Sequence, residues 1–133
     1  MSKKRIVIAD DHAEMLDEVR RLLEKDYEIV AAVEDGSQLV DAAFAHKPDL
    51  VITDISMPVM NGFEAAAKMR GLGLLTDIIF LTVQSTSPYL RKARSLGANG
   101  YVLKVYANEQ LPLAVSKVLN GGSYISPQLN GNH

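Results

Sequence analysis

Short apolar runs alternate along this chain with longer amphipathic segments. Most of these runs are continuous, without the polar alternation of a half-exposed strand, which predicts strands covered on both faces. We expect five strands, at 6–9, 27–33, 50–52, 78–81 and 101–103. The segments between and after them carry apolar residues at helical spacing. They predict five helices, at about 12–24, 39–44, 63–70, 87–96 and 108–120.

Turn and cap residues divide these elements. Asp35 begins a turn and can also cap the helix that follows, and Asn61 with Glu64 three residues later has the pattern of a capping box. Pro112 lies close to the first turn of the last helix, although its missing N–H and its ring disfavour a helix interior. The tail 123–133 is rich in turn residues.

Five strands that alternate with five helices predict an α/β fold with a parallel sheet, right-handed crossovers and helices on both faces. At 133 residues, the chain has the length of one domain. Its residues are 47% hydrophobic and 23% charged, as is usual for globular proteins. A formal net charge of −2 argues against a nucleic-acid-binding surface within this segment.

Other features of the composition narrow the cellular setting. The chain has no cysteine, which excludes thiolate chemistry and suits a reducing compartment. The basic start is followed by only four apolar residues before Asp10 and Asp11, too few for a signal peptide. No stretch has the roughly 18 apolar residues of a membrane helix. We expect a cytoplasmic protein without a membrane partner.

Polar residues follow four of the strands at the same end. Asp10 and Asp11 follow the first strand, Asp54 the third, Thr82 the fourth and Lys104 the fifth. Because carboxyl ends of parallel strands meet at one edge, where open α/β sheets place their sites, we expect these side chains to converge. Each one alone has an ordinary explanation as a helix cap or a solvated charge. All five at one edge indicate a site.

The residue types suggest its chemistry. Three neighbouring carboxylates repel one another unless a cation lies between them, and hard oxygen donors with no His or Cys nearby suit Mg²⁺. The ammonium of Lys104 and the hydroxyl of Thr82 can bind an incoming oxyanion. Together they describe a site for a transferable phosphoryl group, with Asp54, which stands alone, as the nucleophile.

Four stretches give the chain a family resemblance: Ile-Val-Ile-Ala-Asp-Asp-His, Val-Ile-Thr-Asp-Ile-Ser-Met-Pro-Val-Met-Asn-Gly, Ile-Phe-Leu-Thr-Val and Gly-Ala-Asn-Gly-Tyr-Val-Leu-Lys. From Lys3 to about Leu119 the chain resembles a receiver domain of the two-component response regulators. The resemblance implies a flavodoxin-like sheet with strand order 2-1-3-4-5. It also implies that Asp54 accepts a phosphoryl group from a sensor histidine kinase or a small phosphodonor.

The same resemblance assigns the metal ligands. Asp11, Asp54 and the backbone carbonyl of Ser56 would bind Mg²⁺, with Asp10 assisting through water.

The resemblance also assigns the switch residues. Thr82 and Lys104 would hold the phosphoryl oxygens, and Tyr101 would turn inward as the Thr82 hydroxyl moves to the phosphate. Phosphorylation would then shift the population of conformations that partners recognise.

The chain departs from the family pattern at three places. Residue 83 is Val where relatives usually have Ala, Gly or Ser, and we expect its branched side chain to slow phosphorylation. Val105 replaces the Pro of many relatives, so their cis turn is not expected. Ser56 and Gln84 occupy positions that tune phosphate lifetime, and the sequence does not predict that lifetime.

The output is the open question. Asp-Asp-His after the first strand and Asn-Gly-Gly-Ser-Tyr-Ile-Ser-Pro after the last helix favour the LuxR/NarL branch, which regulates transcription through a helix-turn-helix domain. We therefore expect a receiver domain at 1–121, and a tail or linker at 122–133 leading to an output domain outside this chain. DNA would be bound only through that domain, and phosphorylation could drive formation of a homodimer.

Other functions compete with this interpretation. The chain could be a single-domain regulator that acts by binding a protein directly. An aspartyl-phosphate phosphatase would carry Asp-x-Asp after the first strand, and a flavodoxin would need a hydroxyl- and Gly-rich phosphate loop there. The observed Asp10-Asp11-His12 disfavours both. Leu113, apolar but off the main helical stripe, is a faint sign of a contact surface.

Overall fold

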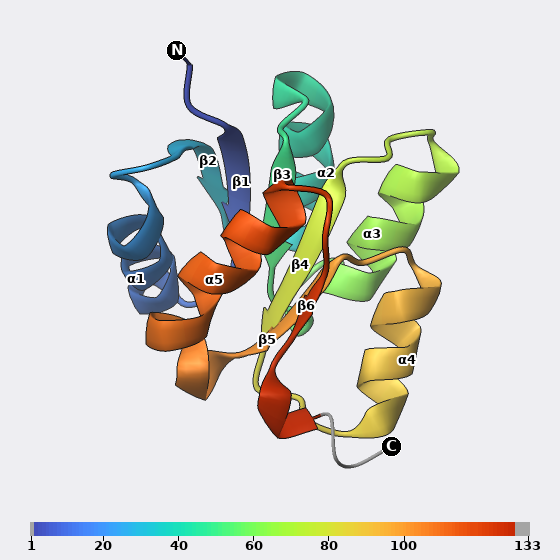
Figure 1. Cartoon of the computed structure of the whole chain (residues 1–133). Helices are drawn as coiled ribbons and strands as arrows, with labels where there is room; N and C mark the ends of the chain where they lie inside the picture. Colours follow the sequence, from blue (N-terminus) through green and yellow to red (C-terminus); the bar gives the residue numbers. More distant parts are fainter. Residues whose placement is uncertain (1, 130–133) are drawn as a thin grey trace.

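A computed structural model describes residues 2–129, and they form one parallel sheet between two layers of helices (Figure 1). The strands are β1 (Arg5–Ala9), β2 (Glu28–Val33), β3 (Leu50–Thr53), β4 (Asp77–Thr82), β5 (Gly100–Leu103) and β6 (Tyr124–Ile125). The α-helices are α1 (Ala13–Leu23), α2 (Gly36–His46), α3 (Gly62–Gly71), α4 (Ser87–Ser95) and α5 (Ala107–Leu119). Two short 3-10 helices, η1 (Lys104–Tyr106) and η2 (Pro127–Leu129), follow β5 and β6.

The sheet has the order β2-β1-β3-β4-β5-β6, and every neighbouring pair is parallel. The α/β class and the order of the first five strands are therefore confirmed. The prediction of five strands was one too few. Tyr124 and Ile125, in the tail predicted to be rich in turns, pair with Gly100 and Tyr101 at the edge of the sheet.

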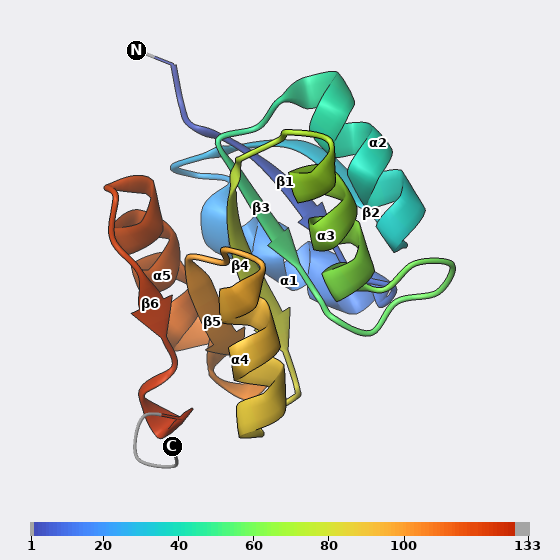
Figure 2. The same cartoon turned by 90° about the vertical axis from the view of Figure 1, so that its right-hand side faces the viewer.

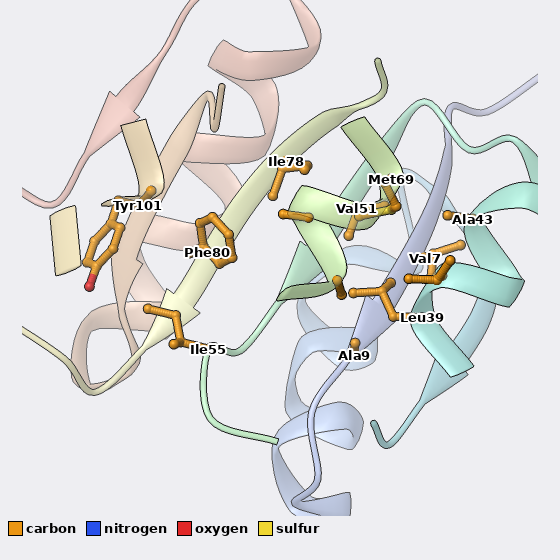
Figure 3. Close-up of a cluster of buried hydrophobic side chains, with 14 of the residues drawn as sticks. Val7, Ala9, Leu39, Ala43, Val51, Ile55, Met69, Ile78, Phe80 and Tyr101 are labelled. Atoms are coloured by element: carbon orange, nitrogen blue, oxygen red, sulfur yellow. The ribbon is translucent and has the colours of Figure 1, made fainter. Parts of the chain in front are cut away.

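Two apolar layers explain why β1, β3, β4 and β5 are continuous apolar runs. On one face, α1 and α5 pack on a cluster that includes Ile8, Ile52 and Val115. On the other, α2, α3 and α4 pack on a cluster that includes Val7 and Phe80 (Figures 2 and 3). Successive residues of a strand point to opposite faces, so strands covered on both sides need apolar residues at every position.

The predicted caps are present. The Asp35 carboxylate accepts a hydrogen bond from the Gln38 N–H at 2.8 Å and begins α2. At α3, the Glu64 N–H donates to Asn61 Oδ1 at 2.8 Å and the Asn61 N–H donates to Glu64 Oε1 at 2.9 Å. This reciprocal pair is the predicted capping box. Pro112 lies inside α5, which begins at Ala107.

The described part of the tail packs on the domain. Leu129 is buried in the cluster beneath α2, α3 and α4. Ser126 is buried as well, and its hydroxyl accepts a hydrogen bond from the Leu103 N–H at 2.9 Å. The proposed domain boundary at residue 121 stays a prediction, but Ser126 and Leu129, beyond that boundary, are buried against the domain. Within residues 2–129, none of the helices has the length and apolar character needed to cross a bilayer.

Candidate phosphoryl-transfer site

The register of the sheet brings the candidate residues to one edge. Ala9 pairs with Thr53, so Asp10 and Asp54 each follow the last residue of adjacent strands. Thr82 pairs with Leu103, which places Lys104 one residue beyond the same edge. The convergence expected from strand order is therefore a direct result of where these polar residues interrupt the apolar runs.

Lys104 links two of the carboxylates. Its Nζ lies 2.7 Å from Asp10 Oδ2 and 2.9 Å from Asp54 Oδ2, and the side chains of all three are largely shielded from solvent. Charge-assisted contacts of this length are strong, and one ammonium balances only one of the two negative charges. The centre of the site therefore keeps a net negative charge, to which Asp11 at its margin adds.

The pKa values reflect this balance between burial and pairing. Burial raises the pKa of Asp54 above its usual range, although the hydrogen bond and charge of Lys104 act in the opposite direction. For Lys104, burial alone would lower the pKa, but its hydrogen bonds to Asp10 and Asp54 raise it. Lys104 is therefore a fixed positive charge, while Asp54 is a carboxylate whose negative charge burial disfavours.

The loop after β3 fixes the backbone of Asp54. The Gly62 N–H donates to the Ile55 carbonyl at 2.7 Å, and a Cβ at Gly62 would overlap the Asp54 carbonyl oxygen. Between them, Val59 has a φ of 69°, rare for a β-branched residue, and the Met60 N–H closes a tight turn onto the Pro58 carbonyl. The loop that contains Pro58, Asn61 and Gly62 thus folds back against the backbone of Asp54 and Ile55.

Thr82 and Tyr101 meet at the loop after β4. The Thr82 hydroxyl oxygen accepts a hydrogen bond from the Gln84 N–H at 3.1 Å. The Tyr101 hydroxyl donates to the Gln84 carbonyl at 2.8 Å, and its ring is buried beside Phe80 (Figure 3). Burial raises the pKa of Tyr101, with the nearby Tyr89 and Asp54 adding to the effect, so the phenol stays protonated. One residue, Gln84, therefore joins the hydroxyl groups of Thr82 and Tyr101.

An apolar-rimmed hollow of about 380 Å³ opens beside Lys104. Val83 and Val105 form part of its wall and are 70% and 80% exposed. The remaining wall comes from Ser85, Leu103, Tyr106, Gln128 and Leu129. Val83 and Val105, two of the positions that depart from the family pattern, therefore line the same hollow as Lys104. All peptide bonds among the described residues are trans.

The expectation that no histidine lies near the carboxylates was wrong. His12 Nδ1 is 3.1 Å from Asp10 Oδ1 and 3.1 Å from Asp11 Oδ1. The Asp10, Asp11, His12 and Asp54 side chains offer ligand atoms that all lie within 4.8 Å of one another. His12 is part of the Asp-Asp-His motif noted in the sequence. The direction of its side chain at a helix N-terminus, however, does not follow from residue spacing.

The structure thus brings together Asp10, Asp11, Asp54 and Lys104 as predicted. Thr82 ends β4 at the same edge and hydrogen bonds with its own loop. Ser56 lies two residues beyond Asp54 with its side chain exposed. An acidic cluster, a fixed ammonium and a hydroxyl-bearing residue therefore share the carboxyl edge of one parallel sheet, with helices on both faces.

Comparison with known proteins assigns the chain to a family. The family model of the response regulator receiver domain matches residues 6–116, and the chain belongs to this family. The chain is 35% identical to the transcriptional regulatory protein DegU of Brevibacillus brevis over 98% of its own length and 56% of that protein. It is 38% identical to the oxygen regulatory protein NreC of Staphylococcus haemolyticus over 94% of its own length and 59% of that protein. It therefore spans little more than half of these relatives.

Comparison with solved structures supports the same family. A LuxR-family response regulator from Aurantimonas superposes with a TM-score of 0.91 at 30% identity, covering 98% of this chain and 94% of that one. The isolated receiver domain of RcsB from Salmonella enterica, determined with the phosphomimetic BeF₃⁻, gives 0.89 at 26% identity, with 98% of each chain covered. The chain is a receiver domain of the LuxR/NarL branch of two-component response regulators, and not an enzyme of the classical kind.

Proposed function

We propose that this chain is a phosphoacceptor switch, phosphorylated on Asp54 in the cytoplasm by a sensor histidine kinase. The observation that carries the proposal is the contact of Lys104 with both Asp10 and Asp54, which holds the acceptor carboxylate against a fixed positive charge. Membership of the receiver family supports it. So does the RcsB receiver domain, a relative whose structure was determined with a phosphomimetic.

The donor set fits Mg²⁺. Asp10, Asp11 and Asp54 offer carboxylate oxygens within 4.8 Å of one another, and hard oxygen donors are what Mg²⁺ prefers. Asp11, Asp54 and the carbonyl of Ser56 would hold the ion, with Asp10 assisting through water. When bound, Mg²⁺ supplies positive charge that offsets the repulsion between the carboxylates and the phosphoryl oxygens.

The chain's own residues then perform the transfer. A carboxylate oxygen of Asp54 forms a bond to phosphorus as the P–N bond of the donor phosphohistidine breaks, and the electron pair returns to the imidazole nitrogen. Lys104 exchanges its contact with Asp54 for one with a phosphoryl oxygen. The Nζ atom needs to move only a short distance for this exchange, because it already lies 2.9 Å from the acceptor carboxylate. Catalysis comes from positioning and charge.

The switch would be carried by Gln84. Its N–H is donated to the Thr82 hydroxyl oxygen and its carbonyl accepts from Tyr101. When Thr82 turns toward a phosphoryl oxygen, its contact with the Gln84 N–H is lost and the loop shifts, while the Tyr101 hydroxyl follows the carbonyl. Phosphorylation thereby favours one arrangement of the loop and of the adjoining α4.

The output we propose is transcriptional. DegU is named as a transcriptional regulatory protein, and the chain covers 56% of its length. In a longer protein of this kind, the switch would change homodimer or interdomain contacts, and a separate output domain would bind DNA. A single-domain regulator remains the alternative, but these relatives favour the first proposal.

Intact-mass measurement after incubation with acetyl phosphate tests the acceptor. We expect a single phosphoryl adduct that requires Mg²⁺, and no adduct in Asp54→Asn. Asp41→Asn, which changes an exposed carboxylate on α2, is the matched control and should be modified like wild type. An adduct that persists in Asp54→Asn, or none in folded wild-type protein that binds Mg²⁺, would refute the assignment.

A further inference from the structure

The imidazole of His12 has no part in the phosphoacceptor mechanism, yet it lies against the acidic cluster. Its Nδ1 is 3.1 Å from an oxygen of Asp10 and 3.1 Å from an oxygen of Asp11. His12 is also the N-cap residue of α1, but its side chain makes no capping hydrogen bond. The side chain is 66% exposed to solvent, but its Nδ1 edge faces the carboxylates, and the His12 backbone N–H donates to the same Asp10 oxygen at 2.9 Å. A helix cap does not explain this direction of the ring.

We propose that His12 is a nitrogen ligand of the metal site and shifts its preference from Mg²⁺ toward first-row transition ions such as Co²⁺ and Ni²⁺. This inference rests on the proposed function, because the ion it concerns is the one bound beside the phosphoacceptor. The proposal adds a nitrogen donor, His12, to a site whose other ligands are carboxylate oxygens. Imidazole nitrogen suits transition metals, whereas Mg²⁺ prefers oxygen donors and retains its waters.

The distances fit one coordination sphere. In an octahedral ion with metal–ligand distances of about 2.1 Å, neighbouring ligands lie about 3 Å apart. His12 Nδ1 has this spacing from both Asp10 Oδ1 and Asp11 Oδ1. The wider set that includes Asp54 spans no more than 4.8 Å, close to the roughly 4.2 Å between opposite ligands of such an ion. The ring nitrogen and the carboxylate oxygens can therefore bind the same ion after small side-chain movements.

The competing explanation is that His12 only donates a hydrogen bond to the two carboxylates. Nδ1 cannot donate a proton and bind a metal at the same time, so the two roles predict different metal dependence. A hydrogen-bond donor that orients carboxylates supports every divalent ion to a similar extent. A nitrogen ligand supports Co²⁺ and Ni²⁺ strongly and Mg²⁺ little, following the order of affinities for nitrogen donors.

The test is metal binding by the whole chain, without an affinity tag, for wild type and His12→Ala. Isothermal titration with Mg²⁺, Co²⁺ and Ni²⁺ gives the affinities. We expect His12→Ala to lose about tenfold or more in Co²⁺ and Ni²⁺ affinity, the scale on which even outer-shell partners of a metal act. Mg²⁺ affinity should change by less than about twofold, the change expected when one weak donor of several is lost.

Direct detection of the ligand completes the test. In the Co²⁺-loaded protein, a coordinated imidazole gives a paramagnetically shifted ring N–H proton signal, which should be present in wild type and absent in His12→Ala. His46→Ala is the matched control. Its residue ends α2 at the opposite edge of the sheet, where its carbonyl accepts a hydrogen bond from Arg5, so both affinities and signal should be unchanged.

The outcomes separate this inference from the function on which it rests. If His12→Ala lowers Mg²⁺ and Co²⁺ affinity equally, or keeps the shifted signal, His12 is not a ligand, and the phosphoacceptor site is unaffected by that result. If wild type binds none of the three ions and forms no adduct with acetyl phosphate, the proposed function itself fails. A selective loss of Co²⁺ and Ni²⁺ affinity together with the signal supports the inference.

Discussion

Replacing Ser126 with Ala tests whether the tail segment is an integral part of the folded domain. Its side chain is fully buried, and its hydroxyl joins three elements. It accepts a hydrogen bond from the Leu103 N–H of β5 at 2.9 Å and donates one to Gln110 Oε1 of α5 at 2.6 Å. Gln110 in turn donates to Gln128 Oε1 of η2 at 3.0 Å. The change to Ala removes one oxygen and leaves the Leu103 N–H and Gln110 Oε1 without this partner.

The expected cost follows from these two groups. An unpaired buried donor or acceptor costs about 1–3 kcal/mol. The amide of Gln110 has partial freedom to turn, so its share lies at the low end, and we expect a total loss of about 2–4 kcal/mol in the free energy of unfolding. At about 4 °C per kcal/mol for a domain of this size, Tm falls by about 8–16 °C.

Urea unfolding followed by circular dichroism measures this loss. Ser123→Ala, an exposed serine in the same tail, should stay within about 0.5 kcal/mol of wild type. The double variant Ser126→Ala with Gln110→Leu should recover part of the loss, because it also removes the unpaired acceptor. A loss below about 0.5 kcal/mol for Ser126→Ala would mean that the hydrogen bonds of this hydroxyl contribute little to stability, and would refute the reasoning.

Three further changes probe the site. Gly62→Ala forces a Cβ onto the Asp54 carbonyl oxygen and should cost about 1–3 kcal/mol in urea unfolding, whereas Gly71→Ala, in open space, should be neutral or slightly stabilising. Lys104→Met leaves the Asp10 and Asp54 carboxylates without their shared ammonium and should lower Tm without Mg²⁺, and by less when Mg²⁺ is added; an equal drop under both conditions would contradict metal binding at this site. Val83→Ala should be phosphorylated faster by acetyl phosphate, and rates equal to wild type would reject crowding by Val83.

The sequence predicted most of the site because the site lies where periodicity breaks. Asp54 and Lys104 each end an apolar run, and parallel strands bring such ends together without further information. What could not be predicted is how they pair. That Lys104 contacts both Asp10 and Asp54 depends on rotamers and on the reach of a four-carbon side chain. Residue spacing along the chain predicts neither the rotamers nor the reach of the side chain.

The sixth strand was missed for a related reason. Tyr124 and Ile125 form only two residues of edge strand, preceded by Gly121 and Gly122 and followed closely by Pro127. A segment of that length has no period to detect, and its surroundings have the composition of a turn. Its pairing depends on tertiary contacts, among them the hydrogen bond of the buried Ser126 hydroxyl with Leu103, and from residue types alone Ser126 is only another polar residue of the tail.

The tail and the candidate site meet at the end of β5. Leu103 donates its N–H to Ser126, and the next residue, Lys104, contacts the two carboxylates. The acidic cluster therefore holds the side chain of the lysine, and the tail holds the backbone of the preceding residue. Because Lys104 begins η1, a movement of its backbone toward a phosphoryl oxygen would have to stretch or carry along the Leu103–Ser126 hydrogen bond. The segment after the last helix is thus mechanically connected to the lysine of the site, although neither the helical stripe nor the strand pattern includes it.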